Sequence, residues 1–148
     1  MAHLVHNKKA HFNYEVLETF DAGMELFGFE VKALRKGQGS LDGSHVTIRG
    51  GEAFLINAHI PPYQVSNTPK DFDTRRNRKL LLTKKEIDTL SGLESQKGLT
   101  ILPISVYNKG SRIKIEIGMA RSKKNYDKRE TIKKRDADRE ARRTLKNE

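Results

Sequence analysis

Apolar and polar residues alternate along several short stretches of the first 120 residues, and this period of two predicts β-strands. The clearest case joins a β-branched, apolar run at 99–107 to a strictly alternating run at 113–117 through the turn-forming residues 108–111. A similar pattern at 45–48 and 53–56 flanks a pair of glycines. Each of these two patterns predicts a β-hairpin.

Two further stretches have strand-like patterns. Residues 14–20 are rich in strand-forming side chains, although they alternate imperfectly. Residues 29–35 alternate cleanly, with Phe29, Val31 and Ala33 on one side. Five or six short strands with few helices predict a small antiparallel β-barrel, and the pattern alone leaves its topology open.

Helix signals are fewer. Thr83 followed by Glu86 forms a capping box, so a helix is predicted from Thr83 until Gly92, a residue type that commonly ends helices. A shorter helix is predicted at 22–27. Few helices beside several strands make the expected fold mainly β, with short helices flanking the barrel.

The composition changes at residue 121. Residues 121–148 carry 12 basic and 6 acidic side chains, contain neither Gly nor Pro, and have too few apolar residues to bury a face. We therefore divide the chain into a folded domain at 1–120 and a basic tail at 121–148. The tail is expected to be disordered alone and helical when it meets a partner. A functionless disordered terminus is the alternative.

Charge indicates the class of partner. The 148 residues carry a net charge of +10, and the isoelectric point is near 9.9. Such an excess favours a polyanionic partner, since each neutralised phosphate releases counterions. A merely solubilising surface is the alternative. The chain lacks cysteine, a long apolar run and a secretory signal, so we expect a cytoplasmic protein without a membrane span.

Signs of catalysis are weak. The sequence has no phosphate-binding loop and no dinucleotide fingerprint, and its five histidines show no paired helical spacing suited to a metal. His59 is interpreted as structural, and Asp71 with Asp73 is flanked by basic residues that favour solvated counter-charges over a metal site. We therefore expect neither an enzyme nor a metal or other cofactor. Recurring basic clusters with nearby aromatic residues favour RNA binding instead.

Five segments resemble, in order and at family spacing, the small protein B (SmpB) family. They are residues 7–10 (NKKA), 28–35 (GFEVKALR), 51–55 (GEAFL), 78–82 (RKLLL) and 126–130 (YDKRE). The resemblance runs from about Asn7 to about Lys146. Five segments in sequence across nearly the whole chain make it specific.

The resemblance implies an oligonucleotide-binding (OB) type β-barrel of about six strands. It also implies a protein that binds the tRNA-like domain of transfer-messenger RNA (tmRNA), as a monomer, and delivers it to the A site of stalled ribosomes. The nascent peptide is then tagged for degradation in trans-translation, a process in which the protein catalyses no step. The tail would enter the 16S rRNA decoding centre and the empty mRNA channel.

The resemblance also implies site residues. Contacts to tmRNA would come from Asn7, Lys8, Asp21, Glu30, Lys32, Arg35, Arg75, Arg78, Lys79, Leu81 and Lys114. Contacts of the tail to the decoding centre would come from Lys123, Lys124, Tyr126, Asp127, Lys128, Arg129 and Leu145. For two of these residues a structural role is an equal alternative: Glu30 as a partner of Lys32 or Arg35, and Leu81 as a core residue.

Three other classes of protein remain as rivals. The nearest is a ribosomal or translation-factor-like protein with a similar barrel that binds another RNA. A nuclease or RNA-modifying enzyme is disfavoured by the missing acid–base or metal cluster. A basic membrane-surface protein would need an amphipathic tail with an apolar stripe, which this tail lacks.

Overall fold

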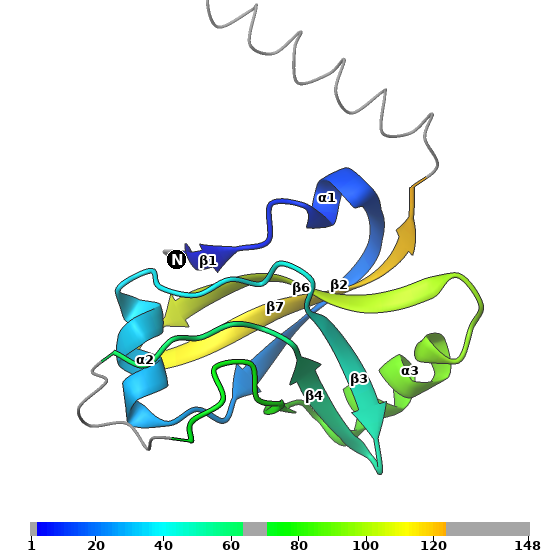
Figure 1. Cartoon of the computed structure of the whole chain (residues 1–148). Helices are drawn as coiled ribbons and strands as arrows, with labels where there is room; N and C mark the ends of the chain where they lie inside the picture. Colours follow the sequence, from blue (N-terminus) through cyan, green and yellow to red (C-terminus); the bar gives the residue numbers. More distant parts are fainter. Residues whose placement is uncertain (1–2, 64–70, 124–148) are drawn as a thin grey trace, which may run out of the picture.

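The computed structural model describes residues 3–63 and 71–123. The strands are β1 (His3–His6), β2 (Tyr14–Met24), β3 (His45–Arg49), β4 (Glu52–Ile56), β5 (Arg78–Leu81), β6 (Leu99–Lys109) and β7 (Arg112–Ser122). The helices are α1 (Ala10–Asn13), α2 (Gly28–Arg35) and α3 (Lys84–Glu94) (Figure 1). The fold is mainly β, as predicted.

All strand pairings are antiparallel, and together they close on themselves. The order β6–β3–β4–β5–β2–β7 returns to β6 because β6 also pairs with β7. β1 adds to the half of β6 around Ser105, whereas β3 meets β6 at Ile101. Six strands therefore form a ring, which leaves β1 as an added outer strand. The number of strands in the ring agrees with the prediction, and its assignment to the OB type remains a prediction.

Both predicted hairpins are confirmed. β3 and β4 pair from His45↔Ile56 to Arg49↔Glu52 around Gly50 and Gly51, whose φ values of 58° and 75° suit a tight hairpin turn. β6 and β7 pair from Leu99↔Arg121 to Lys109↔Arg112. β7 continues to Ser122, two residues beyond the predicted domain boundary.

The prediction of a strand at 29–35 is wrong, because residues 28–35 form α2. Glu30, Ala33 and Leu34 are its buried residues, and they have the i, i+3, i+4 spacing of one helix face. The alternation predicted a strand because it counted Glu30 as an outward-facing polar residue, whereas Glu30 is buried with Ala33 and Leu34 on the inner face of the helix. The Glu30 carboxylate accepts a hydrogen bond from the N–H of Phe27 at 2.8 Å, which satisfies a free donor at the start of the helix.

The short helix predicted at 22–27 is also wrong. Residues 22–24 are the end of β2, where Gly23 and Met24 pair with β5 on one side and Gly23 pairs with β7 on the other. Pairing on both sides satisfies these backbone groups in the sheet, so local helix propensity does not decide the outcome.

The helix predicted at Thr83 is confirmed with its capping box: the Thr83 hydroxyl accepts from the Glu86 N–H at 3.2 Å, and the Glu86 carboxylate accepts from the Thr83 N–H at 3.1 Å. It ends at Glu94 and not at Gly92. The Glu94 carboxylate accepts the backbone N–H of Ile48 at 2.8 Å and the hydroxyl of Thr47 at 3.2 Å. This contact with β3 secures the last turn of α3 and explains why the helix continues past Gly92.

The hydrophobic core lies mainly inside the ring. Fully buried side chains include Leu34 of α2, Leu90 of α3, and Leu55, Leu80, Ile101 and Ile115 of the strands. A smaller cluster of Ala10, Leu102 and Ala120 lies under α1. Figure 1 shows α2 beside the end of the β6–β7 hairpin and α3 beside β3. Among the described residues, no helix is long and apolar enough to cross a membrane.

Candidate nucleic-acid interface

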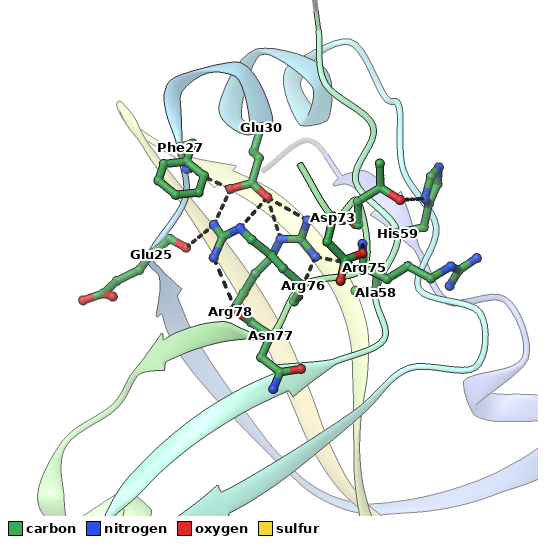
Figure 2. Close-up of polar contacts among 11 residues, drawn as sticks. Glu25, Phe27, Glu30, Ala58, His59, Asp73, Arg75, Arg76, Asn77 and Arg78 are labelled. Carbon is green, nitrogen blue, oxygen red and sulfur yellow. Dashed lines mark hydrogen bonds and ion pairs between the residues drawn. The ribbon is translucent and has the colours of Figure 1, made fainter. Parts of the chain in front are cut away.

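The carboxylate of Glu30, in the first turn of α2, is the centre of a buried polar cluster (Figure 2). Its side chain has no exposed surface. The carboxylate accepts a hydrogen bond from the Nε of Arg78 at 2.8 Å and lies 2.7 Å from the Nη2 of the same residue. Arg76 pairs with both carboxylate oxygens, through its Nε at 3.2 Å and through its Nη2. Two guanidinium groups therefore share one carboxylate.

Arg78 links this cluster to the chain on either side of it. It is fully buried, at the first position of β5, and donates to the carbonyl oxygens of Ala58 at 2.8 Å, Thr74 at 2.9 Å and Arg76 at 3.1 Å. Burial lowers the pKa of Arg78 from its ordinary value, and the charge of Glu30 offsets part of that effect. Arg78 thus fixes the segment before β5 against α2.

The charge state of Glu30 follows from its partners. Burial alone would raise the pKa of the Glu30 carboxyl group, but the hydrogen bonds from Arg76 and Phe27 and the charge of Arg78 outweigh it. The pKa of Glu30 is therefore lowered below 4.5, and the group is ionised at neutral pH. Two cations and one anion leave the cluster with a net charge of +1.

Arg76 extends from this cluster toward the surface. Its side chain is 25% exposed, and its Cζ lies 4.4 Å from the centre of the Phe27 ring. Phe27 itself is 52% exposed. Neither residue is among the site residues predicted from the sequence. The sequence contains a signal for this cluster: two arginines two positions apart in a polar segment, and a glutamate at the third position of a helix. This signal could be recognised only if residues 28–35 were known to form a helix.

The predicted contacts Glu30 and Arg78 are buried in this cluster, so their side chains support the surface and do not form it. The alternative that Glu30 is a structural residue fits its environment. However, the partners suggested for it, Lys32 and Arg35, are wrong, because Glu30 pairs with Arg76 and Arg78. Lys32 and Arg35 are instead exposed on α2.

A hollow of about 390 Å³ brings three predicted contacts together. Arg35, Leu81 and Lys114 line it from α2, β5 and β7, and Arg112 adds a fourth long side chain. The Nη2 of Arg35 donates to the carbonyl of Ser111 at 2.9 Å, which ties α2 to the β6–β7 turn. Leu81 is 50% exposed, so it is not a core residue. The hollow is therefore lined by both basic and apolar side chains.

A second group of predicted residues lies near β1 and β6. Asn7 is buried, and its side-chain N–H donates to the carbonyl of Pro103 at 2.8 Å, whereas the neighbouring Lys8 is exposed. The Asp21 carboxylate accepts the hydroxyl of Tyr107 at 2.7 Å. Burial and this hydrogen bond raise the pKa of Tyr107 to about 12. Asn7 and Asp21 therefore each have a structural contact within the domain.

The remaining predicted tmRNA contacts, Arg75 and Lys79, lie apart from the hollow. Arg75 is exposed and donates to the carbonyl of Asn57 at 3.1 Å. Lys79 forms a surface ion pair with Glu52 at 3.2 Å. His59 lies 3.1 Å from the Thr74 hydroxyl and is half-buried, which fits its structural interpretation.

Most of the predicted tail site lies outside the described residues. Lys123 is described, and its backbone N–H donates to the carbonyl of Asn13 at 2.8 Å. The residues outside are Lys124, Tyr126, Asp127, Lys128, Arg129 and Leu145. Within the described part of the chain, no three His, Asp or Glu side chains are grouped to hold a metal ion.

The known proteins that are similar to this chain have consistent descriptions. The model of one family, described as SmpB protein, matches residues 4–147. An SsrA-binding protein of Gloeothece citriformis is 50% identical over 140 residues, which are 95% of this chain and 90% of the relative. An SsrA-binding protein of Mesoplasma florum is also 50% identical, over 95% of this chain and 94% of its own.

A solved structure described as "tmRNA-SmpB: a journey to the center of the bacterial ribosome" contains a chain of similar fold. The TM-score is 0.70 and the sequence identity 42%, with 84% of this chain and 87% of that chain covered.

Proposed function

The chain belongs to the SmpB family, and from this premise we propose that it is a tmRNA-binding protein of trans-translation. It binds the tRNA-like domain of tmRNA and delivers it to the A site of a stalled ribosome, so that the ribosome is released and the nascent peptide is tagged. The observation that carries this proposal is the family match over residues 4–147. The family binds RNA, and the chain is not an enzyme.

The hollow between α2, β5 and β7 is the proposed main contact with tmRNA. Lys32, Arg35 and Lys114 would neutralise phosphates, and the exposed Leu81 would contact a sugar or base. A closed ring with α2 fixed by a buried ion cluster offers these side chains from rigid elements. Such a surface suits recognition of RNA by shape.

Two further parts of the tmRNA-binding face are proposed. Lys8 and Asp21 would contribute near β1 and β2, with Asn7 holding the backbone that carries Lys8. Arg75 and Lys79 would extend the basic surface along the segment that leads into β5. Glu30 and Arg78 would act on RNA binding only through the positions of other residues.

The domain division at 1–120 and 121–148 also belongs to this proposal. The basic tail would enter the decoding centre and the vacant mRNA channel, with Lys123, Lys124 and Tyr126 followed by Asp127, Lys128, Arg129 and, further on, Leu145. An intact message would fill this channel, so a tail that folds there reports that the message is missing. The cost of ordering the tail is offset only when the channel is open. The protein would act in the cytoplasm, as a monomer on each tmRNA.

Competition binding tests the choice of RNA. Labelled tmRNA is bound at about 150 mM salt, where generic phosphate contacts are weakened, and is challenged with bulk tRNA and with duplex RNA. We expect tmRNA to resist a large excess of both competitors. Equal competition by all three RNAs would contradict the proposal and favour a generic ribosomal RNA binder.

A truncation tests the division of labour. A fragment of residues 1–124 is expected to bind tmRNA with the affinity of the full chain, since it retains the ring and all described contacts. The same fragment is expected to support no peptidyl transfer to tmRNA on stalled ribosomes, because it lacks the tail. The full chain is the control in both assays, and full tagging by the fragment would refute the proposed role of the tail.

A further inference from the structure

Phe27 combines an exposed ring with a fixed backbone. At 52% exposure it is the most exposed of the large apolar side chains in the described residues. Its N–H donates to the Glu30 carboxylate at 2.8 Å, and its carbonyl accepts from the N–H groups of Glu30 and Val31, each at 3.0 Å. The ring therefore projects from a turn of chain that is bonded on both sides.

Two other aromatic rings pack against Phe27. Phe29 stacks against it with centroids 5.5 Å apart and planes 25° apart. Phe72 meets Phe27 edge-on at 6.4 Å and Phe29 edge-on at 4.8 Å. This aromatic cluster limits the rotation of the Phe27 ring, so little conformational entropy remains to be lost when a ligand packs on it.

The guanidinium group of Arg76 completes the surface at 4.4 Å from the Phe27 ring centre. Its Nε and Nη2 bond the buried carboxylate of Glu30, its Nη1 donates to the carbonyl of Asn77 at 3.3 Å, and Nη2 also faces the carbonyl of Glu25 at 3.5 Å (Figure 2). Every nitrogen therefore has an acceptor within the protein. Four of its five N–H groups are thus directed at protein acceptors, and the one that remains cannot make the two parallel bonds of a bidentate phosphate contact.

We propose that Phe27 and Arg76 form a stacking platform for one unpaired nucleobase of the bound RNA. Bases in single-stranded segments stack on aromatic rings and on guanidinium planes, and both kinds of surface are adjacent here. The net charge of +1 on the Glu30 cluster and +10 on the chain favour a polyanion over an apolar protein segment. The proposal rests on the proposed function, because it takes tmRNA as the RNA.

The test compares variants of the full chain in tmRNA binding across a range of salt concentrations. Phe27→Leu keeps an apolar side chain but removes the ring, and we expect it to weaken binding about 5- to 150-fold, since one stacked base contributes roughly this much. The slope of log affinity against log salt should not change, because no phosphate contact is lost. Phe27→Tyr should restore most of the affinity. Leu17→Ala, at another exposed apolar residue, is the matched control and should bind normally.

Ultraviolet cross-linking of the same complexes gives a direct readout. Mass spectrometry should find a nucleotide adduct on Phe27 in the unmodified chain. Circular dichroism establishes that each variant is folded before it is compared.

Normal binding by Phe27→Leu together with no adduct at residue 27 would overturn the proposal. So would a fall of about one in the salt slope, which would indicate a phosphate contact. Failure of the proposed function is distinguishable, because the unmodified chain itself would then not prefer tmRNA to its competitors.

Discussion

Glu30→Gln isolates the contribution of the buried carboxylate to stability. The substitution preserves size and shape, but it removes the anion that pairs with both Arg76 and Arg78. The Arg78 side chain has no exposed surface, so water cannot replace the lost charge. An uncompensated buried charge costs about 3–5 kcal/mol. That is a large part of the roughly 5–15 kcal/mol by which a domain is stable.

Urea unfolding followed by circular dichroism measures this loss. With a slope of about 2 kcal/mol/M, near the middle of the range for a small domain, the midpoint should fall by roughly 1.5–2.5 M. The control is Glu52→Gln, which breaks the exposed ion pair with Lys79 and should cost no more than about 1 kcal/mol. The double variant Glu30→Gln/Arg78→Met should recover much of the loss, because it removes the cation as well.

The pH dependence supplies a second check. The pKa of Glu30 is lowered in the folded state, so its contribution to stability is complete above about 4.5 and is lost as the pH falls through the folded-state value. The difference between the unmodified chain and Glu30→Gln should therefore be constant above pH 4.5 and shrink below it. A loss smaller than 1 kcal/mol at pH 7, or a difference that grows on acidification, would refute the reasoning.

Three further predictions concern other parts of the domain. Gly118→Ala should destabilise it by about 1–3 kcal/mol in urea unfolding, because the added Cβ would lie 2.8 Å from Ile104 and 3.0 Å from Val16 in a packed region; an unchanged midpoint would contradict this. Ultraviolet titration should show a tyrosine that ionises near pH 12, and this transition should be absent in Tyr107→Phe. Since folding raises this pKa, the stability that the hydroxyl contributes is complete below pH 10 and is lost as the pH rises toward 12. Thr83→Ala should lower the free energy of unfolding by about 1 kcal/mol through loss of the α3 cap, and Thr83→Ser should restore it.

The predictable parts of the fold were those set by local signals. Glycines at a turn between alternating strands predicted both hairpins, and a threonine with a glutamate three residues later predicted α3. The prediction at α2 was wrong because eight residues are too few for their periodicity to separate a strand from a helix. The decision came from contacts that are distant in sequence: Glu30 is buried against Arg76 and Arg78, which lie 46 and 48 residues away.

The candidate site shows the same limit. The basic character of Lys32, Arg35 and Lys114 could be read from the sequence, and so could their place in a family motif. That Arg35 and Lys114 line one hollow depends on how α2 packs beside β7. Whether Arg78 supports RNA binding or contacts RNA depends on burial, which a run of basic residues does not reveal. Arg76 differs from Arg78 mainly by its 25% exposure.

The closure of the ring has a consequence for how the protein folds during its synthesis. β2 pairs along most of its length with β7, from Tyr14↔Ser122 to Gly23↔Lys114, so the partners are about 100 residues apart in the chain. At a synthesis rate of about 5–20 residues per second, β2 waits roughly 5–20 s before β7 is made. During that time its edge is open, and distant pairings of this kind also slow the folding step itself. A nascent chain of this protein should therefore depend on chaperones until the ring closes. The ring can close only after the ribosome has translated the message as far as β7.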